Sequence, residues 1–209
     1  SIGGNYIVII KEDRDANLWI GTYQGGLNRF VRENETFIRY GNGEKQRKGL
    51  SDNSAISILH DSQDRFWVGT VKGGLNLLNR ETGTAHVFNY APEEVNGISG
   101  TIINAVAEDS QGRIWAGSSF NSPAGNILSL NRLDSLNIFS PDSAFASFTR
   151  FHEQSQDNSN FINTSVSTLL QDPNDPNTLW ISTRDAGIGK LNILSNRINW
   201  LQNNPQDAT

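Results

Sequence analysis

Four copies of one sequence pattern follow one another along this chain, and they constrain its fold more than any other feature. Each copy starts at an aspartate and soon reaches a tryptophan. The copies read DRDANLWIGTYQGGLNRF, DSQDRFWVGTVKGGLNLLNR, DSQGRIWAGSSFNSPAGNILSLNR and DPNDPNTLWISTRDAGIGKLNI. The aspartates are Asp13, Asp61, Asp109 and Asp172, and the tryptophans are Trp19, Trp67, Trp115 and Trp180. The tryptophans are 48, 48 and 65 residues apart, and a period in the forties is typical of a four-stranded propeller blade.

The second copy shows the expected strands most clearly. Short alternating or β-branched segments lie between polar or glycine-rich turns, which favours strands over helices. These segments are Ser54–His60, Arg65–Thr70, Gly74–Asn79 and Thr84–Tyr90. We therefore predict an all-β propeller with blades of four antiparallel strands at residues 1–48, 49–96, 97–158 and 159–209. The third tryptophan step is longer by 17 residues, and we expect these insertions in the loops between strands.

The repeated residues have structural interpretations. Aspartate favours hairpin turns because its carboxylate accepts hydrogen bonds from nearby backbone amides. The pairs Gly25-Gly26 and Gly73-Gly74 fit turns that need a positive φ. We interpret the four tryptophans as packing residues between sheets, not as ligand platforms.

Composition excludes several classes of protein. The chain has 209 residues, 17 Lys and Arg against 22 Asp and Glu, and a net charge of −5. The basic run Lys45–Lys48 (KQRK) is interpreted as a solvated loop, so neither nucleic acid nor an anionic membrane is expected as a partner. Cysteine is absent, which excludes disulfides and thiolate metal sites. No apolar run approaches eighteen residues, and the start at Ser1 without any methionine suggests a piece of a longer, processed polypeptide.

The segment NLWIGTYQGGLNRF closely resembles the repeat of the two-component regulator propeller family. Leu18–Thr22 with Gly25-Gly26-Leu27 matches the family pattern, and Phe66–Thr70 with Gly73-Gly74-Leu75 matches nearly as well. The third copy lacks the paired glycine, and the fourth has Ser182 in place of the first glycine. Gly49–Asn53 resembles the Leu-Ser-x-Asn start of a blade in this family.

This resemblance implies a function and a location. Family members look like periplasmic sensor regions of bacterial membrane receptors, and many resemble systems that detect polysaccharide fragments. Their propellers precede a β-sandwich, a membrane helix and a histidine kinase or nucleotide cyclase. A family ring usually needs about seven or eight blades, so four blades form half a ring with exposed sheet faces. We expect such a chain to self-associate or to be a fragment.

Ligand candidates lie in the loops that should surround the central opening. The resemblance places the loops between second and third strands, and those between blades, on one face. The inner loops are Tyr23-Gln24, Val71-Lys72, Ser118–Ala124 and Arg184-Asp185, and the inter-blade loops are Gly41–Asn53, Ala91–Gly100 and His152–Asn163. Tyr23 and Phe120 could stack on a sugar ring. Gln24, Lys72, Arg184 and Asp185 could bind its hydroxyl or acid groups, although each could also be an ordinary exposed turn residue.

Catalysis is not expected. The aspartates recur once per blade and should lie apart, so they do not suggest an acid–base pair. His60, His86 and His152 are scattered and fit structural roles better than metal or base roles. We predict no catalytic residue, metal or cofactor. Two alternatives remain: a carbohydrate-active propeller, since DSQGRIW faintly resembles the Asp-box of sialidases, and a lectin-like scaffold without membrane coupling.

Overall fold

The computed structural model describes residues 1–43, 47–91, 93–119, 129–140, 143–151, 165–184 and 186–202. Within these ranges the regular structure is entirely β and falls into four separate sheets. None of the described residues forms a helix long and apolar enough to cross a membrane. The all-β prediction is therefore confirmed.

The four sheets are called blades 1 to 4 in chain order. Blade 1 contains β1 (Ile7–Glu12), β2 (Leu18–Thr22), β3 (Leu27–Val31), β4 (Thr36–Gly41) and β5 (Arg47–Lys48). Blade 2 contains β6 (Ala55–His60), β7 (Phe66–Thr70), β8 (Leu75–Leu78) and β9 (Ala85–Phe88). Blade 3 contains β10 (Ile102–Glu108), β11 (Ile114–Ser119), β12 (Ser129–Ser140) and β13 (Ser143–Phe151). Blade 4 contains β14 (Val166–Gln171), β15 (Thr178–Thr183), β16 (Ile188–Asn192) and β17 (Arg197–Leu201).

Each blade is an antiparallel meander of four strands, and this confirms the predicted blade architecture. The strands of blade 2 agree with the four segments expected from the second copy to within two residues at each end. Blade 1 also has the short strand β5, which pairs with β4 in parallel and was not expected. Each sheet lies inside one of the four expected segments, while the exact limits of the blades stay predictions.

The insertions in the third copy do not all lie between strands. We expected the extra residues in loops, but those between Arg132 and Phe151 lengthen β12 to 12 residues and β13 to 9 residues. The two strands remain paired from Leu130↔Phe151 out to Ser140↔Ser143. This part of the expectation is wrong, because the extra residues continue the hairpin ladder and keep their backbone groups hydrogen-bonded.

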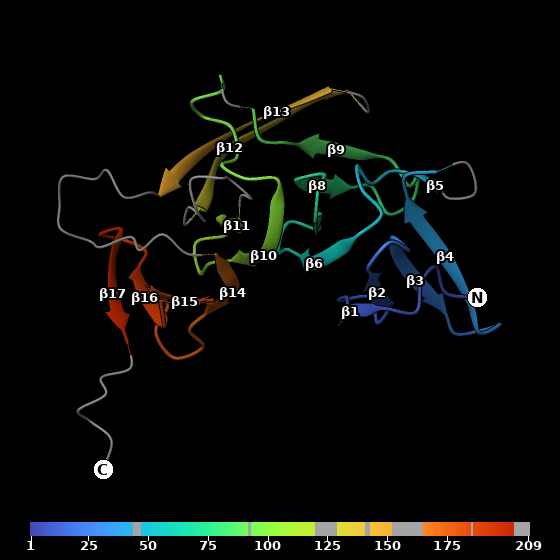
Figure 1. Ribbon diagram of the computed structural model, residues 1–209, viewed down its shortest axis with the longest axis horizontal. Coiled ribbons are helices and arrows are strands. Elements are labelled where there is room, and N and C mark those ends of the chain that lie inside the picture. Colours follow the sequence, from blue (N-terminus) through green and yellow to red (C-terminus); the bar gives the residue numbers. More distant parts are fainter. Residues whose placement is uncertain are drawn as a thin grey trace, which may run out of the picture.

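The blades are arranged in an arc. Figure 1 shows the first strands β1, β6, β10 and β14 along the concave side, and the last strands β9 and β13 along the convex side. The strands β4 and β17 lie on the outer flanks of the arc. Every blade therefore presents its first strand to the space that the arc partly encloses.

Buried side chains fill the space between neighbouring blades. One cluster joins Trp19 and Tyr40 of blade 1 to Phe66 of blade 2. Corresponding clusters contain Trp67, between blades 2 and 3, and Trp115, between blades 3 and 4. These three tryptophans are completely buried, and aromatic side chains of this size dominate core energetics.

Candidate functional site

The first strand of each blade contains the same irregularity. The pairing register with the second strand shifts between Ile7 and Ile9 in blade 1 and between Ala55 and Ser57 in blade 2. It shifts again between Ile103 and Ala105 in blade 3, and between Val166 and Thr168 in blade 4. One residue is left unpaired at each shift, as in a β-bulge, and bulges re-aim side chains. The unpaired residues are Val8, Ile56, Asn104 and Ser167.

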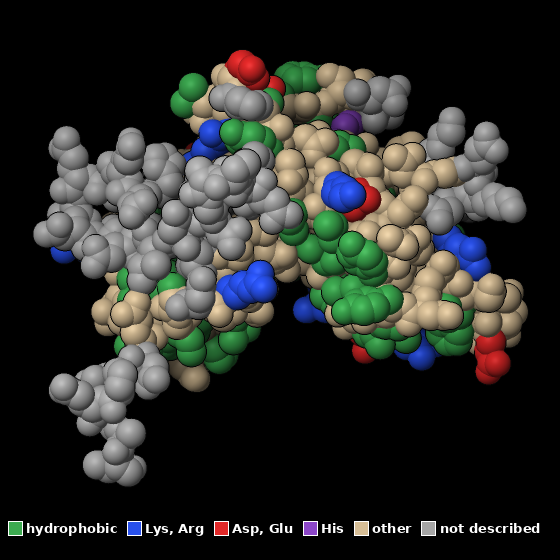
Figure 2. Space-filling view, in the orientation of Figure 1, with side chains coloured by type: hydrophobic (Ala, Val, Ile, Leu, Met, Phe, Trp, Pro, Cys, Tyr) green, Lys and Arg blue, Asp and Glu red, His purple; other side chains and the backbone are tan. Residues whose placement is uncertain are grey.

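All four bulge residues line one cavity on the concave side of the arc. This axial cavity has a volume of about 510 Å³. Its lining is Val8, Ile56, Ile102, Asn104, Ser119, Ser165, Ser167 and Arg184. In Figure 2 the concave side appears as a notch, with hydrophobic side chains beside it on the side of blade 1. Repetition of one bulge thus brings four positions, far apart in sequence, to a shared site.

The bulge residues in the axial cavity differ in polarity from blade to blade. Blades 1 and 2 contribute Val8 and Ile56, whereas blades 3 and 4 contribute Asn104 and Ser167. The Asn104 amide donates to the Val166 carbonyl over 2.9 Å and to Ser119 Oγ over 3.2 Å. These bonds fix the side chain, and its Oδ1 accepts no hydrogen bond from the described residues.

Arg184 supplies the charge of the axial cavity. Its backbone amide donates to the Ser165 carbonyl over 3.1 Å, which holds the β15–β16 loop next to the start of β14. The side chain is exposed, and its guanidinium forms no ion pair with a described residue. A guanidinium beside hydroxyl and amide groups is suited to bind a carboxylate or a hydroxyl-rich molecule.

The other ligand candidates lie at equivalent loops but do not line this cavity. Tyr23 is 44% exposed, and its ring lies 5.9 Å from the ring of Tyr6. Gln24 has a positive φ of 66°, and its backbone N–H donates to Ser54 Oγ over 3.1 Å. The Lys72 amide donates to the Asp52 carboxylate over 3.2 Å. Phe120 and Asp185 lie outside the described residues.

Each repeated aspartate binds the tryptophan of its own blade. The indole Nε1 donates to a carboxylate oxygen over 2.7 Å at Asp13, 2.8 Å at Asp61, 2.7 Å at Asp109 and 2.7 Å at Asp172. The other oxygen accepts backbone amides of the turn, as at Asp61, which binds Gln63 and Arg65. The carboxylates are therefore parts of four separate turns.

Two of these carboxylates have lowered pKa values. Burial alone would raise the pKa of Asp13, but hydrogen bonds from the Trp19 indole and from Asn17 outweigh it and leave the pKa below its usual value. At Asp172, the backbone amide of Asn174 and then the Trp180 indole lower the pKa. Both groups stay ionised at neutral pH, which is the wrong state for a general acid.

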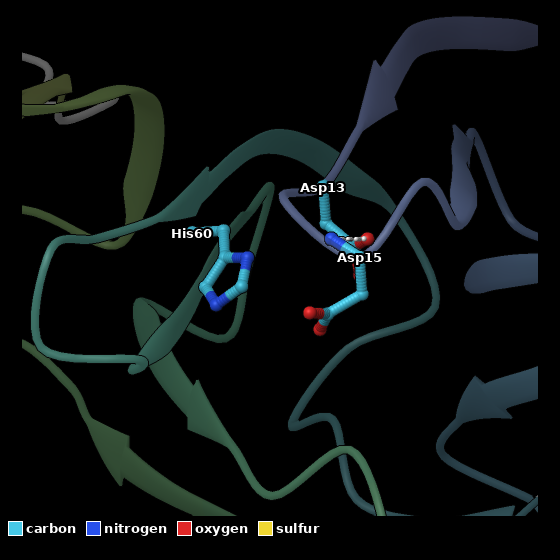
Figure 3. Close-up of side chains that lie close together, drawn as sticks. All are labelled: Asp13, Asp15 and His60. Carbon is cyan, nitrogen blue, oxygen red and sulfur yellow. Dashed lines mark hydrogen bonds between the residues drawn. The ribbon is translucent and has the colours of Figure 1, made fainter.

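One cluster has the ligand types of a metal site. Oxygens of Asp13 and Asp15 and a ring nitrogen of His60 lie within 4.8 Å of one another, where the β1–β2 turn meets the end of β6 (Figure 3). However, Arg80 Nη1 already binds Asp13 over 3.2 Å and Asp15 over 2.9 Å. Its Nη2 binds Asp64 over 2.8 Å, and His60 Nε2 lies 2.6 Å from the same oxygen. The Arg80 guanidinium thus takes the place of a metal cation between the two aspartates, and Arg14 Nη2 lies 3.1 Å from His60 Nε2. These contacts link blade 1 to blade 2.

Sequence reasoning missed most of the axial cavity. It identified Arg184 but not Asn104 and Ser167 in the first strands, nor Ser165 directly before β14. A signal existed, because Val8, Ile56 and Asn104 are spaced by the repeat period of 48 residues. Their side chains share no residue type, so only the register of strand pairing reveals that they are equivalent.

Two segments match the family model described as Two component regulator propeller, residues 49–72 and 97–120. Each segment begins before the first strand of a blade and includes that strand and the aspartate turn. It ends just after the second strand, which contains the tryptophan. A comparison with curated proteins finds no match.

Solved structures share this fold. The extracellular domain of a protein described as the hybrid two component system BT3049 from B. thetaiotaomicron matches 95% of this chain with a TM-score of 0.70 and 19% identity. The corresponding domain of BT4673 from the same organism matches 97% with a TM-score of 0.50 and 19% identity. The chain spans 25% and 30% of the length of these two structures. Fold and repeat motif agree: residues 49–72 and 97–120 match the Two component regulator propeller model, and the chain shares the fold of these extracellular domains.

Proposed function

We propose that this chain is part of a ligand-sensing propeller in a bacterial transmembrane signalling receptor, and that it lies outside the cytoplasm. The observation that carries the proposal is the axial cavity, where the repeated bulge brings four side chains together beside Arg184. The matched family model and the extracellular domains with the same fold support the signalling context and the location.

The chemistry of the axial cavity favours an acidic oligosaccharide as ligand. Asn104, Ser165 and Ser167 offer amide and hydroxyl groups for sugar hydroxyls. Arg184 offers a charged donor for a carboxylate. Val8 and Ile56 offer an apolar wall for the less polar face of a sugar ring.

Turnover of the ligand is not part of this proposal. The repeated aspartates each bind an indole in a separate turn, so they do not form the paired carboxylates that a glycosidase uses. Among the described residues, the lining of the axial cavity contains no carboxylate. Binding would instead bias the arrangement of receptor chains.

Isothermal titration calorimetry with a uronic-acid oligosaccharide and its neutral counterpart tests the proposal. We expect the acidic sugar to bind more tightly, and Arg184→Ala to weaken it about tenfold, the loss of one charge-assisted hydrogen bond. Arg32→Ala is the control, because Arg32 is exposed and pairs with Glu12 away from the cavity. Equal affinity of Arg184→Ala and the parent chain would refute the site, and release of shorter sugars would favour the catalytic alternative.

A further inference from the structure

The long hairpin of blade 3 reaches over blade 2. Near its base, Leu133 and Phe148 are buried in the cluster that contains Trp67 and Leu77 of blade 2. Towards its tip, Ile138, Phe139 and Phe145 are 54%, 71% and 57% exposed. Figure 1 shows β13 passing above β9 on the convex side of the arc. The hairpin thus adds an apolar flap to one blade interface.

A second cavity lies between this flap and blade 2. Its volume is about 570 Å³, and we call it the rim cavity. Ile138, Phe139 and Ser140 line it from the hairpin, while Arg65, Leu77 and His86 are among the residues that line it from blade 2. Because Leu77 pairs with His86 across β8 and β9, these two side chains share the sheet face that points towards blade 3.

Arg65 has donor groups that the protein does not use. Its Nε binds Asp61 over 2.6 Å, and its side chain is only 20% exposed. Its Nη1 and Nη2 donate no hydrogen bond to any described residue. Arg113 occupies the same place in blade 3 and binds Asp109 in the same way, but its Nη2 donates to the Ile193 carbonyl over 3.2 Å. Within the described residues, Arg65 has no equivalent carbonyl partner.

Two other ionisable side chains, His86 and Asp64, line the rim cavity. His86 is half-buried, and its ring nitrogens make no hydrogen bond with a described residue. Asp64 also lines the cavity, but its carboxylate already pairs with Arg80 over 2.8 Å. The donors of Arg65 and His86 are partly exposed and stand next to apolar walls, so a ligand in the cavity can accept hydrogen bonds from them.

We propose that the rim cavity binds a small organic acid with a flat apolar body. The apolar body would lie against Phe139, Ile138 and Leu77, and the acid group would accept hydrogen bonds from Arg65 and His86. This site is separate from the axial cavity, with which it shares no lining residue. It therefore adds a second recognition site to the proposed sensor and does not depend on the identity of the sugar.

Titration of the whole chain with naphthoate, followed by amide chemical shifts in NMR, tests this proposal. We expect saturable binding with shifts at the β8–β9 turn and at the hairpin tip, and about tenfold weaker binding of the uncharged analogue naphthalene methanol. Phe139→Ser should also weaken the binding of naphthoate about tenfold, because an apolar contact is lost. Since Phe139 is 71% exposed, this variant keeps the fold intact.

Three further variants separate the rim cavity from other apolar surfaces. Arg65→Gln should weaken naphthoate binding about as much as removal of the ligand's charge does. If Arg65→Gln destabilises the Asp61 turn, Phe139→Ser still tests the site. Phe145→Ser alters an exposed phenylalanine of the same hairpin that does not line the cavity, and Arg184→Ala alters the axial cavity. Both should leave naphthoate affinity unchanged. Absence of saturable binding, or equal losses in Phe139→Ser and Phe145→Ser, would overturn the proposal.

Discussion

The repeated aspartate joins the surface turn of each blade to its core. At Asp109, one carboxylate oxygen accepts the amides of Gln111 and Arg113, and the other accepts the Trp115 indole and Arg113 Nε. The carboxylate is buried, so each of these donors would lose its partner without it. Its recurrence in every copy thus has a structural cause.

Replacement of this aspartate should destabilise the chain more in a blade whose tryptophan is completely buried. We expect Asp109→Ala to lower the free energy of unfolding by about 3 kcal/mol, because it leaves the buried indole N–H of Trp115 and the Nε of Arg113 without partners. Asp172→Ala should cost clearly less, since Trp180 of blade 4 is only half-buried. Urea denaturation of both variants measures the difference, and equal losses would contradict a role set by burial.

At the scale of elements, the sequence predicts strands better than it predicts their irregularities. Alternation in segments such as Ser54–His60 reveals strands because side chains of successive residues point to opposite faces. The bulge at Ile56 breaks that alternation by one residue, and no residue type marks it. The extension of β12 was missed for a related reason, since counting residues between Arg132 and Phe151 cannot distinguish a longer loop from a longer ladder.

A glycine in the second strand of a blade lets the next blade approach closely. At Gly69, an added methyl group would overlap the Ser57 hydroxyl and the Ile103 carbonyl oxygen of blade 3. At Gly117, it would overlap the Val166 side chain of blade 4. Blade 4 has Ser182 at the equivalent position, on the face that no described blade covers. The loss of glycine in the fourth copy coincides with the loss of this contact.

Substitution of this glycine should therefore act through the blade interface. We expect Gly69→Ala to destabilise the chain by about 2 kcal/mol, since the backbone of blade 3 must move to relieve the overlap. Ser182→Ala is the matched control and should change stability by less than about 0.5 kcal/mol. Thermal and urea unfolding measure both changes in stability. If Gly69→Ala left the free energy of unfolding unchanged, blade 3 would not lie as close to Gly69 as the structure shows.

At the scale of the whole molecule, the tryptophans of blades 1 to 3 pack on the following blade, and within the described residues no further blade covers the tryptophan of blade 4. Trp19, Trp67 and Trp115 are completely buried, whereas Trp180 is half-buried. The pairing registers place Leu170, Ile188 and Leu201 on the same sheet face as Trp180. They are 59%, 47% and 51% exposed. This open face of blade 4 is an apolar surface of the type that a further blade would cover in a larger ring.

We expect the chain of 209 residues to self-associate through this open face, because exposed apolar patches of a sheet promote association. Sedimentation velocity over a range of concentrations should show a rising sedimentation coefficient. The double variant Leu170→Lys/Ile188→Lys should remain monomeric, since it places charge on the face without disturbing buried residues. Val95→Lys is the control, because Val95 is 82% exposed but lies in the loop that precedes blade 3. A parent chain that stays monomeric at high concentration, or a Val95→Lys variant that dissociates equally well, would mean that the open face does not drive association.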